Sequence, residues 1–230
     1  MKKVILSTLI LSTIFLFAIN NSYAQKSKKS FKGIITYNIT YKGDIDPATL
    51  AQQPKEVTIK ILGNKQKMEI ISVPAVITTI RDGDKKHSIV LVDIMGQKYA
   101  VKLEQKDIEE ELEENPKPTI NYLDETKTIA GYTCKKAEVI TKEEDTEEES
   151  KLVVYYSEDI GVSADINYGS QFNGLKGFPL EYVTTSNDME ITFSAGKIEK
   201  KKIKDTEFLI PSDFKEVTQD ELQEMFGGGE

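Results

Sequence analysis

Hydrophobic and polar residues alternate along most of the chain, and the pattern is clearest near its start. Between residues 31 and 42 the odd positions hold the large apolar side chains and one glycine: Phe31, Gly33, Ile35, Tyr37, Ile39 and Tyr41. The even positions are mostly polar. Alternation with a period of two is typical of a β-strand with one buried face. Residues 31–42 are therefore predicted to form such a strand.

Similar segments recur down the chain. We predict further strands at residues 57–61, 67–72, 76–81, 87–94, 98–104, 134–141, 152–157, 179–186, 189–194 and 197–204. Turn-forming residues separate many of them, at Gly63-Asn64, Asp82-Gly83-Asp84, Met95-Gly96, Asn187-Asp188 and Ala195-Gly196. Because parallel pairing needs longer crossovers, these short connections indicate an antiparallel meander.

Helical signals are few and short. Residues 43–54 are expected to form a loop with a helical turn at 48–52, and residues 107–114 a short acidic helix. Thr218 and Glu221 have the spacing of a capping box, which predicts a C-terminal helix that packs Leu222 and Phe226 onto the sheet. The predicted fold is mainly β: a curved antiparallel meander sheet, or half-barrel, with one or two short helices, including a C-terminal one.

The first 24 residues have the pattern of a signal peptide. Lys2 and Lys3 are followed by an uncharged, apolar run from residue 4 to 19, and small residues stand at Ser22 and Ala24. Cleavage after Ala24 would leave a single β-rich domain of residues 25–230 with no later segment that could span a membrane. The expected location is the periplasm or the outside of the cell.

Charge and cysteine content narrow the expected partners. The full chain carries a net charge of −8, and removal of the two lysines would make it −10. An acidic protein is not expected to bind nucleic acid. Cys134 is the single cysteine, so an internal disulfide is excluded, and we expect the thiol to be a small buried group. Oligomeric state stays open.

Residues that could carry catalysis are scarce. His87 is the only histidine, which excludes zinc sites built from two or more imidazoles. No Gly-x-Ser-x-Gly or phosphate-binding loop is present, and a Cys134–His87 dyad is the weak alternative. The acidic run at 143–150 lacks the Asp-x-Asp-x-Asp-Gly frame of a calcium loop. We expect no enzyme activity, no catalytic residues, no cofactor and no metal.

Two clusters carry a family resemblance. The first contains Ile129, Gly131, Tyr132, Cys134, Lys136 and Ala137, and the second Phe172, Gly174, Leu175, Gly177, Pro179, Leu180 and Glu181. In this pattern the chain resembles exported bacterial proteins of unknown function related to those named for the GLPGLI motif, although Lys176 replaces the motif's proline. A signal peptide followed by meandering strands and a short helix is also similar, more loosely, to the LolA/LolB lipoprotein carriers. That resemblance implies a half-barrel that holds acyl chains on its concave face.

The favoured function is a non-catalytic binder or carrier of an apolar ligand, such as a lipid or a lipidated protein. A curved sheet with few helices leaves an apolar concavity that needs a cover. The residues predicted to line it are Tyr37, Ile39, Ile59, Ile61, Met68 and Ile70. The alternative is a structural or interaction protein of the cell envelope that docks through a sheet edge or through the acidic loop.

Overall fold

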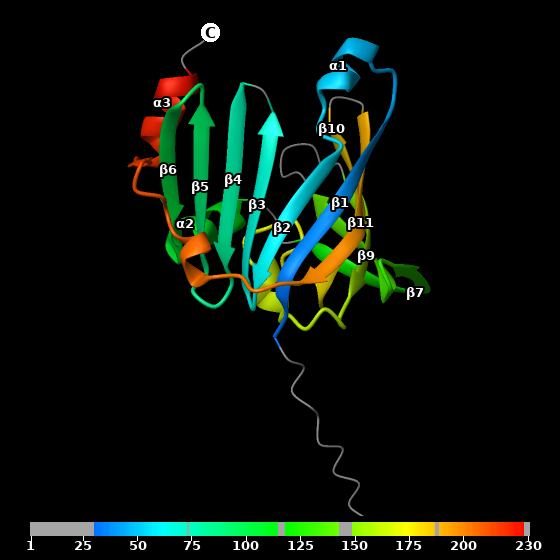
Figure 1. The fold of residues 1–230 in the computed structure, drawn as a ribbon. Coiled ribbons are helices and arrows are strands. Elements are labelled where there is room, and N and C mark those ends of the chain that lie inside the picture. Colours follow the sequence, from blue (N-terminus) through cyan, green and yellow to red (C-terminus); the bar gives the residue numbers. More distant parts are fainter. Residues whose placement is uncertain (1–29, 73, 115–117, 143–148, 187–188, 228–230) are drawn as a thin grey trace, which may run out of the picture.

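The computed structural model describes residues 30–72, 74–114, 118–142, 149–186 and 189–227 (Figure 1). These residues form a single 12-stranded sheet. Its strands are β1 (Lys32–Lys42), β2 (Glu56–Leu62), β3 (Lys65–Ser72), β4 (Ala75–Asp82), β5 (His87–Ile94), β6 (Gln97–Leu103), β7 (Thr119–Ile129), β8 (Tyr132–Lys142), β9 (Glu149–Ser157), β10 (Phe178–Ser186), β11 (Met189–Lys200) and β12 (Lys215–Glu216). The α-helices are α1 (Pro47–Gln52), α2 (Gln105–Glu114) and α3 (Gln219–Gly227), and two 3-10 helices are η1 (Ala164–Asn167) and η2 (Asp205–Phe208).

Two antiparallel meanders make up this sheet. Strands β1 to β6 form the first and β7 to β11 the second, and the pairing of β1 with β11 joins them. The strand order is therefore β12-β6-β5-β4-β3-β2-β1-β11-β10-β9-β8-β7. The predicted antiparallel meander is confirmed, with one exception: β12 runs parallel to β6 over two residue pairs.

The sheet is forced to curl by the connection between its meanders. Ten strand spacings separate β6 from β7 in the strand order, which in a flat sheet would be roughly 48 Å at ~4.8 Å per strand. Residues 104–118 have to bridge that gap, and most of them form the ten-residue helix α2, which is only about 15 Å long. The two halves therefore bend toward each other, and β7 comes close to β11 (Figure 1).

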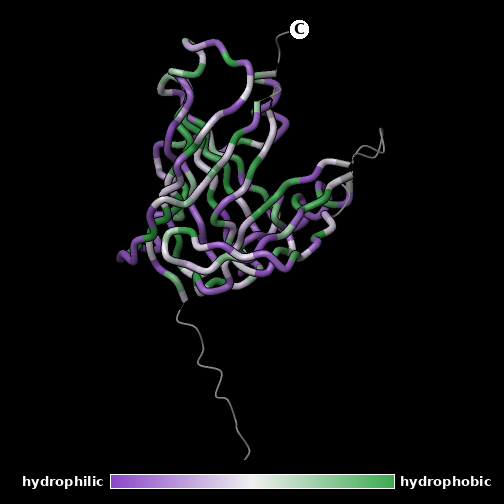
Figure 2. The backbone as a smooth tube through the Cα atoms, turned by 90° about the vertical axis from the view of Figure 1, so that its right-hand side faces the viewer, coloured by the Kyte–Doolittle hydropathy of each residue, from purple (hydrophilic) through white to green (hydrophobic). Residues whose placement is uncertain are grey.

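The main core lies on the inner face of the curl. Figure 2 shows two arms of the chain meeting at an angle, with hydrophobic residues gathered where they meet. Alternate residues of β1 and β2 point into this core, as the period of two predicts. Its most deeply buried members are Ile35, Tyr37, Ile61, Cys134, Ile166, Phe178 and Leu180.

The first meander also buries part of its outer face. Ile80, Ile89 and Leu91 pack there against Ile203 and Phe208 from the segment that follows β11. This second core explains why the strands from β4 to β6 are apolar on both faces. It also places the C-terminal segment across the back of the sheet, so that α3 ends beside β6 (Figure 1).

Some details differ from the sequence prediction. The turn predicted at Ala195-Gly196 is wrong, because β11 runs through it as one strand with a β-bulge. Thr36 pairs with Lys197 and Tyr37 with Ala195, so Gly196 is the extra residue. A glycine fits here because a Cβ at this position would lie 2.5 Å from the side-chain nitrogen of Asn38.

The helices largely follow the prediction. The turn expected at 48–52 is α1, the acidic helix is α2, and three short α-helices form where one or two were expected. The capping box of α3 is confirmed by hydrogen bonds in both directions between Thr218 and Glu221. Phe226 meets the ring of Tyr99 on β6 edge-on at 5.7 Å but stays 46% exposed, so α3 packs loosely.

Removing one buried hydroxyl should show how tightly the two meanders are joined. Tyr37 is only 1% exposed, and its hydroxyl donates a hydrogen bond to the carbonyl oxygen of Pro179 at 2.5 Å. Tyr37→Phe leaves that buried carbonyl unpaired, so we expect the free energy of unfolding to fall by about 1–3 kcal/mol.

Tyr41→Phe is the matched control, measured by the same urea denaturation. Tyr41 is on the same strand and its hydroxyl donates to the carbonyl oxygen of Pro54 at 2.7 Å, but this pair is only partly buried. Water can replace the lost bond there, so the control should lose less stability. Equal losses in the two variants would contradict the importance of the buried bond.

Candidate functional site

The first motif cluster begins at a tight hairpin. Ala130 and Gly131 connect β7 to β8, and both have positive φ angles, of 47° and 83°. Two successive positive φ angles are typical of the two-residue turns that suit the twist of a hairpin. A Cβ on Gly131 would meet nothing within 4 Å. This glycine therefore serves the backbone conformation of the turn, and no close contact with a neighbouring group requires it.

The second cluster is a corner that leads into β10. Gly174 and Gly177 have φ angles of 87° and 112°, and Leu175 between them is fully buried. The buried Asn167 side chain donates to the carbonyl oxygens of Leu175 at 3.0 Å and of Gly177 at 2.8 Å. Two hydrogen bonds from one buried amide fix the backbone path of this corner.

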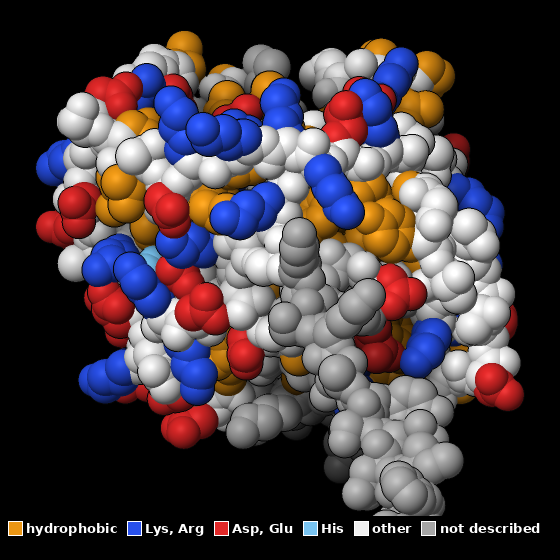
Figure 3. All heavy atoms as spheres, turned by 60° about the horizontal axis from the view of Figure 1, so that its bottom comes forward, with side chains coloured by type: hydrophobic (Ala, Val, Ile, Leu, Met, Phe, Trp, Pro, Cys, Tyr) orange, Lys and Arg blue, Asp and Glu red, His pale blue; other side chains and the backbone are white. Residues whose placement is uncertain are grey.

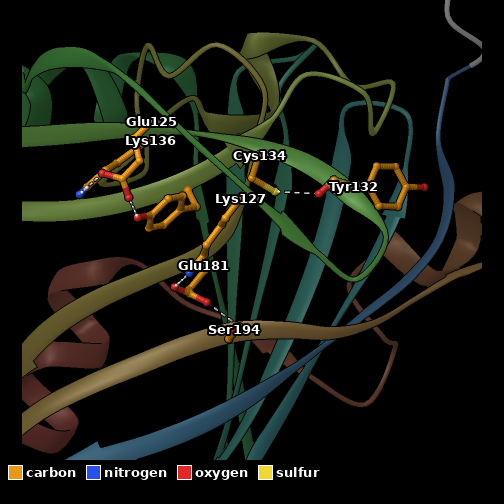
Figure 4. Close-up of polar contacts among 8 residues, drawn as sticks. Glu125, Lys127, Tyr132, Cys134, Lys136, Glu181 and Ser194 are labelled. Atoms are coloured by element: carbon orange, nitrogen blue, oxygen red, sulfur yellow. Dashed lines mark hydrogen bonds and ion pairs between the residues drawn. The ribbon is translucent and has the colours of Figure 1, made fainter.

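The family-motif thiol is enclosed in the main core. Cys134 is 0% exposed, and its Sγ donates to the carbonyl oxygen of Tyr132 at 3.5 Å (Figure 4). Burial raises the pKa of this thiol to about 11. The expectation of a buried cysteine is confirmed. A thiol with this pKa is protonated at neutral pH, and a protonated thiol is a weak nucleophile.

Charged residues near Cys134 are already paired with each other. The Lys127 amine forms an ion pair with Glu181, whose other carboxylate oxygen accepts from the Ser194 hydroxyl at 2.8 Å (Figure 4). Lys136 pairs with Glu125 at 2.8 Å, and the Tyr155 hydroxyl donates to the same carboxylate. These contacts tie β7, β8, β9, β10 and β11 together, which is a structural role.

His87 belongs to a different part of the molecule. It lies at the start of β5 beside the groove formed by Lys102, Asp205 and Phe208. No contact among the described residues joins it to Cys134, and the described residues contain no group of three or more His, Cys, Asp or Glu side chains that could hold a metal ion. No described helix is long and apolar enough to cross a membrane.

A cavity of about 220 Å³, partly open to solvent, lies on the inner face of the curl. Strands β1 to β4 form one wall, and the segment from Asn167 to Tyr182 forms the other. Its apolar lining comes from Tyr37, Ile59, Met68, Phe172, Phe178 and Pro179. Gln66, Arg81, Asn167, Ser170, Gln171 and Tyr182 add polar groups.

Half of the predicted lining residues border this cavity. Tyr37, Ile59 and Met68 do so, while Ile39, Ile61 and Ile70 belong to the packed core around it. The motif residue Pro179 also lines it, so the second motif cluster shapes part of the wall.

Sequence reasoning missed the polar members of the lining. Gln66 donates to the carbonyl oxygen of Ile166 at 2.6 Å, but the Nε atom of Arg81 is buried and has no hydrogen-bond partner among the described residues. Burial lowers the pKa of Arg81, although Glu111 opposes this shift. The alternation along β4 shows which residues share a face with Arg81. Because both faces of that strand are apolar, the pattern does not show which of them is the inner face.

A wider groove of about 860 Å³ opens at the end of the sheet where β1 begins. The buried residues Phe31 and Ile160 form part of its floor, and the exposed residues Lys200, Lys201 and Lys202 lie at its rim. Figure 3 shows lysines and hydrophobic side chains side by side on this face. Since the apolar residues of this groove are the underside of the main core, the cavity on the inner face is the better candidate for a ligand.

A family profile described as a domain of unknown function (DUF4412) matches residues 31–214. The chain belongs to this family. The match covers the whole sheet except the two-residue strand β12, together with η1 and η2, and therefore includes both motif clusters and the cavity. No curated protein sequence matches the chain.

The solved structures include a distant likeness. The crystal structure of the hypothetical lipoprotein YmcC from Escherichia coli is 8% identical, with a TM-score of 0.30, and the alignment covers 75% of this chain and 89% of that one. A similarity this remote does not establish a shared ligand or activity. A link to GLPGLI proteins or to LolA/LolB carriers is not shown by these similarities.

The burial of Cys134 predicts that its thiol reacts slowly in the native protein. At pH 8, we expect the native protein to react with a disulfide reagent such as 5,5′-dithiobis(2-nitrobenzoate) far more slowly than the urea-unfolded chain. A folded-state pKa of about 11 exceeds the ordinary thiol value of about 8.5. The stability that this difference contributes is present below about pH 8.5 and is lost as the pH rises toward 11. Rapid labelling of the native thiol would contradict this assignment.

The two motif glycines should differ in their tolerance of alanine. In Gly177→Ala the new Cβ would lie 2.7 Å from the carbonyl oxygen of Ser157, and the positive φ adds strain, so unfolding should become easier by roughly 2–4 kcal/mol. Gly131→Ala meets open space and should cost only about 1 kcal/mol. Thermal or urea unfolding of both variants measures the difference. A larger loss at Gly131 would show that this corner is not closely packed.

Proposed function

We propose that this protein is exported and acts outside the cytoplasm as a non-catalytic binder or carrier of an apolar ligand. The observation that carries the proposal is the cavity on the inner face of the curled sheet, lined by Tyr37, Ile59 and Met68. The signal-peptide pattern of residues 1–24 supports the location.

The cavity leaves apolar side chains uncovered on the inner face of the sheet. They include Tyr37, Met68 and Phe172. Removing apolar surface from water is favourable by about 25 cal/mol per Å². An apolar occupant that covers these side chains therefore stabilises the protein, which supports a binding role over a purely structural one.

The size of the cavity limits the ligand to one narrow chemical group. The volume of about 220 Å³ is below the ~300–1,000 Å³ of ordinary small-molecule pockets, but above the ~150 Å³ that holds benzene in an engineered core. This is enough for one end of a single acyl chain. A lipid with one inserted chain, or a partner protein that carries one, fits better than a bulky multi-chain lipid.

The sheet-edge alternative has less support. β7 forms one end of the strand order, but its pairing with β8 is interrupted by an irregularity between Leu123 and Thr126 that includes Asp124 and Glu125. Bulges and charges on an edge strand discourage pairing with another chain. The acidic run is mostly outside the described residues, since 143–148 are not described.

A bulky residue inside the cavity should block binding. In Met68→Trp the larger side chain occupies the space, so uptake of a fluorescent fatty acid should weaken at least tenfold. The natural chain contains no tryptophan, so the new indole also reports by its emission whether the site is buried.

Ile71→Trp is the matched control. Ile71 lies on the same strand, three residues away on the opposite face, and is 58% exposed. This variant should bind like the natural protein. If the natural protein takes up no fluorescent fatty acid and carries no acyl species by mass spectrometry after purification from its host, the proposed function is wrong.

A further inference from the structure

The cavity contains a single charged side chain. Of the described residues that line it, Arg81 alone is ionised at neutral pH, and no carboxylate lines the wall. Its Nε atom is buried without a hydrogen-bond partner among the described residues. Burying an unpaired donor of a charged group is costly. The fold thus keeps a costly, partly buried positive charge at the wall of a cavity whose lining is partly apolar.

Neighbouring aromatic rings hold a second polar group at the same wall. The Tyr182 ring stacks on Phe193 with centroids 4.8 Å apart and meets Phe172 edge-on at 4.9 Å. Tyr182 lines the cavity and interacts electrostatically with Arg81. Burial raises the pKa of Tyr182, so its hydroxyl keeps its proton and can donate a hydrogen bond.

The acidic residue that attracts Arg81 does not line the cavity. Glu111 on α2 attracts the charge of Arg81 but lines a separate groove beside Leu103 and Asp107. Glu111 therefore lowers the cost of burying the charge of Arg81 without placing a carboxylate in the lining of the cavity.

We propose that the cavity binds the carboxylate of an aliphatic acid, with Arg81 as the carboxylate-binding residue and Tyr182 as a second donor. This inference rests on the proposed function and narrows its ligand class. A guanidinium binds a carboxylate through two parallel hydrogen bonds, and Arg81 is the guanidinium at this wall. Met68, Ile59 and Phe178 then contact the first methylene groups.

The same geometry disfavours neutral chains. An alcohol, an ester or the amide-linked chain of a lipidated protein brings no negative charge to Arg81 and cannot form the charge-assisted pair. A site built to pair a buried polar group discriminates strongly against ligands that lack the matching group. A free fatty acid is therefore the preferred occupant over a lipid-modified partner.

Two ligands of equal length test this preference in the natural protein. Decanoate and decan-1-ol share the same chain, and at pH 8 only decanoate is charged. We expect isothermal titration to show that decanoate binds about 10- to 100-fold more tightly, as the loss of a charged hydrogen bond implies. This comparison needs no substitution, so it does not depend on the folding of a variant.

Substitutions then assign the preference to residues. Arg81→Met replaces the guanidinium group with an apolar side chain of similar length. This variant should lose the preference for decanoate and should still bind decan-1-ol. Arg81→Lys keeps the charge without the planar fork and should give an intermediate ratio. Tyr182→Phe keeps the stacked ring and should weaken decanoate alone, by about 3- to 10-fold.

The outcomes separate the two proposals. Equal affinity of the natural protein for the two ligands, or a preference that survives in Arg81→Met, would overturn carboxylate recognition and leave apolar binding standing. Failure of both ligands to bind would overturn the proposed function itself.

Discussion

The antiparallel pairing of β1 with β11 is the interaction on which the rest of this structure depends. It joins two meanders that are separate along the sequence, and it runs for most of the length of β1. Because α2 then has to bridge strands far apart in the strand order, the joined sheet can only exist as a curl. The inner core, the cavity on the inner face and the approach of β7 to β11 all follow from that one pairing.

Much of the sheet could be read from the sequence, because burial of one face imposes a period of two. The strands β1 and β2 show it directly, with Ile35, Ile39 and Ile61 all inward. The strand β7 (Thr119–Ile129) escaped prediction because this edge strand is largely exposed and shows no regular alternation of burial. Gly196 misled the prediction because a glycine in a bulge and a glycine in a turn have the same local pattern.

The candidate site was harder to predict than the fold. The motif residues stand out in sequence, but Gly131, Cys134 and Gly177 serve turns and packing. The cavity depends on which residues of distant segments meet, as Arg81 of β4 meets Tyr182 of β10. The local sequence of neither segment predicts that these two residues lie at the same cavity, because their proximity results from the curl that the long-range pairing produces.

The order of the strands has a consequence for how the protein reaches its native state. One edge of β1 is completed by β2 as soon as both are made, but the other must wait for β11, near the end of the chain. Contacts between such distant segments slow folding, and an open strand edge invites aggregation in the meantime. The first meander therefore remains an incomplete half that is vulnerable to association with other chains until the last third of the polypeptide arrives.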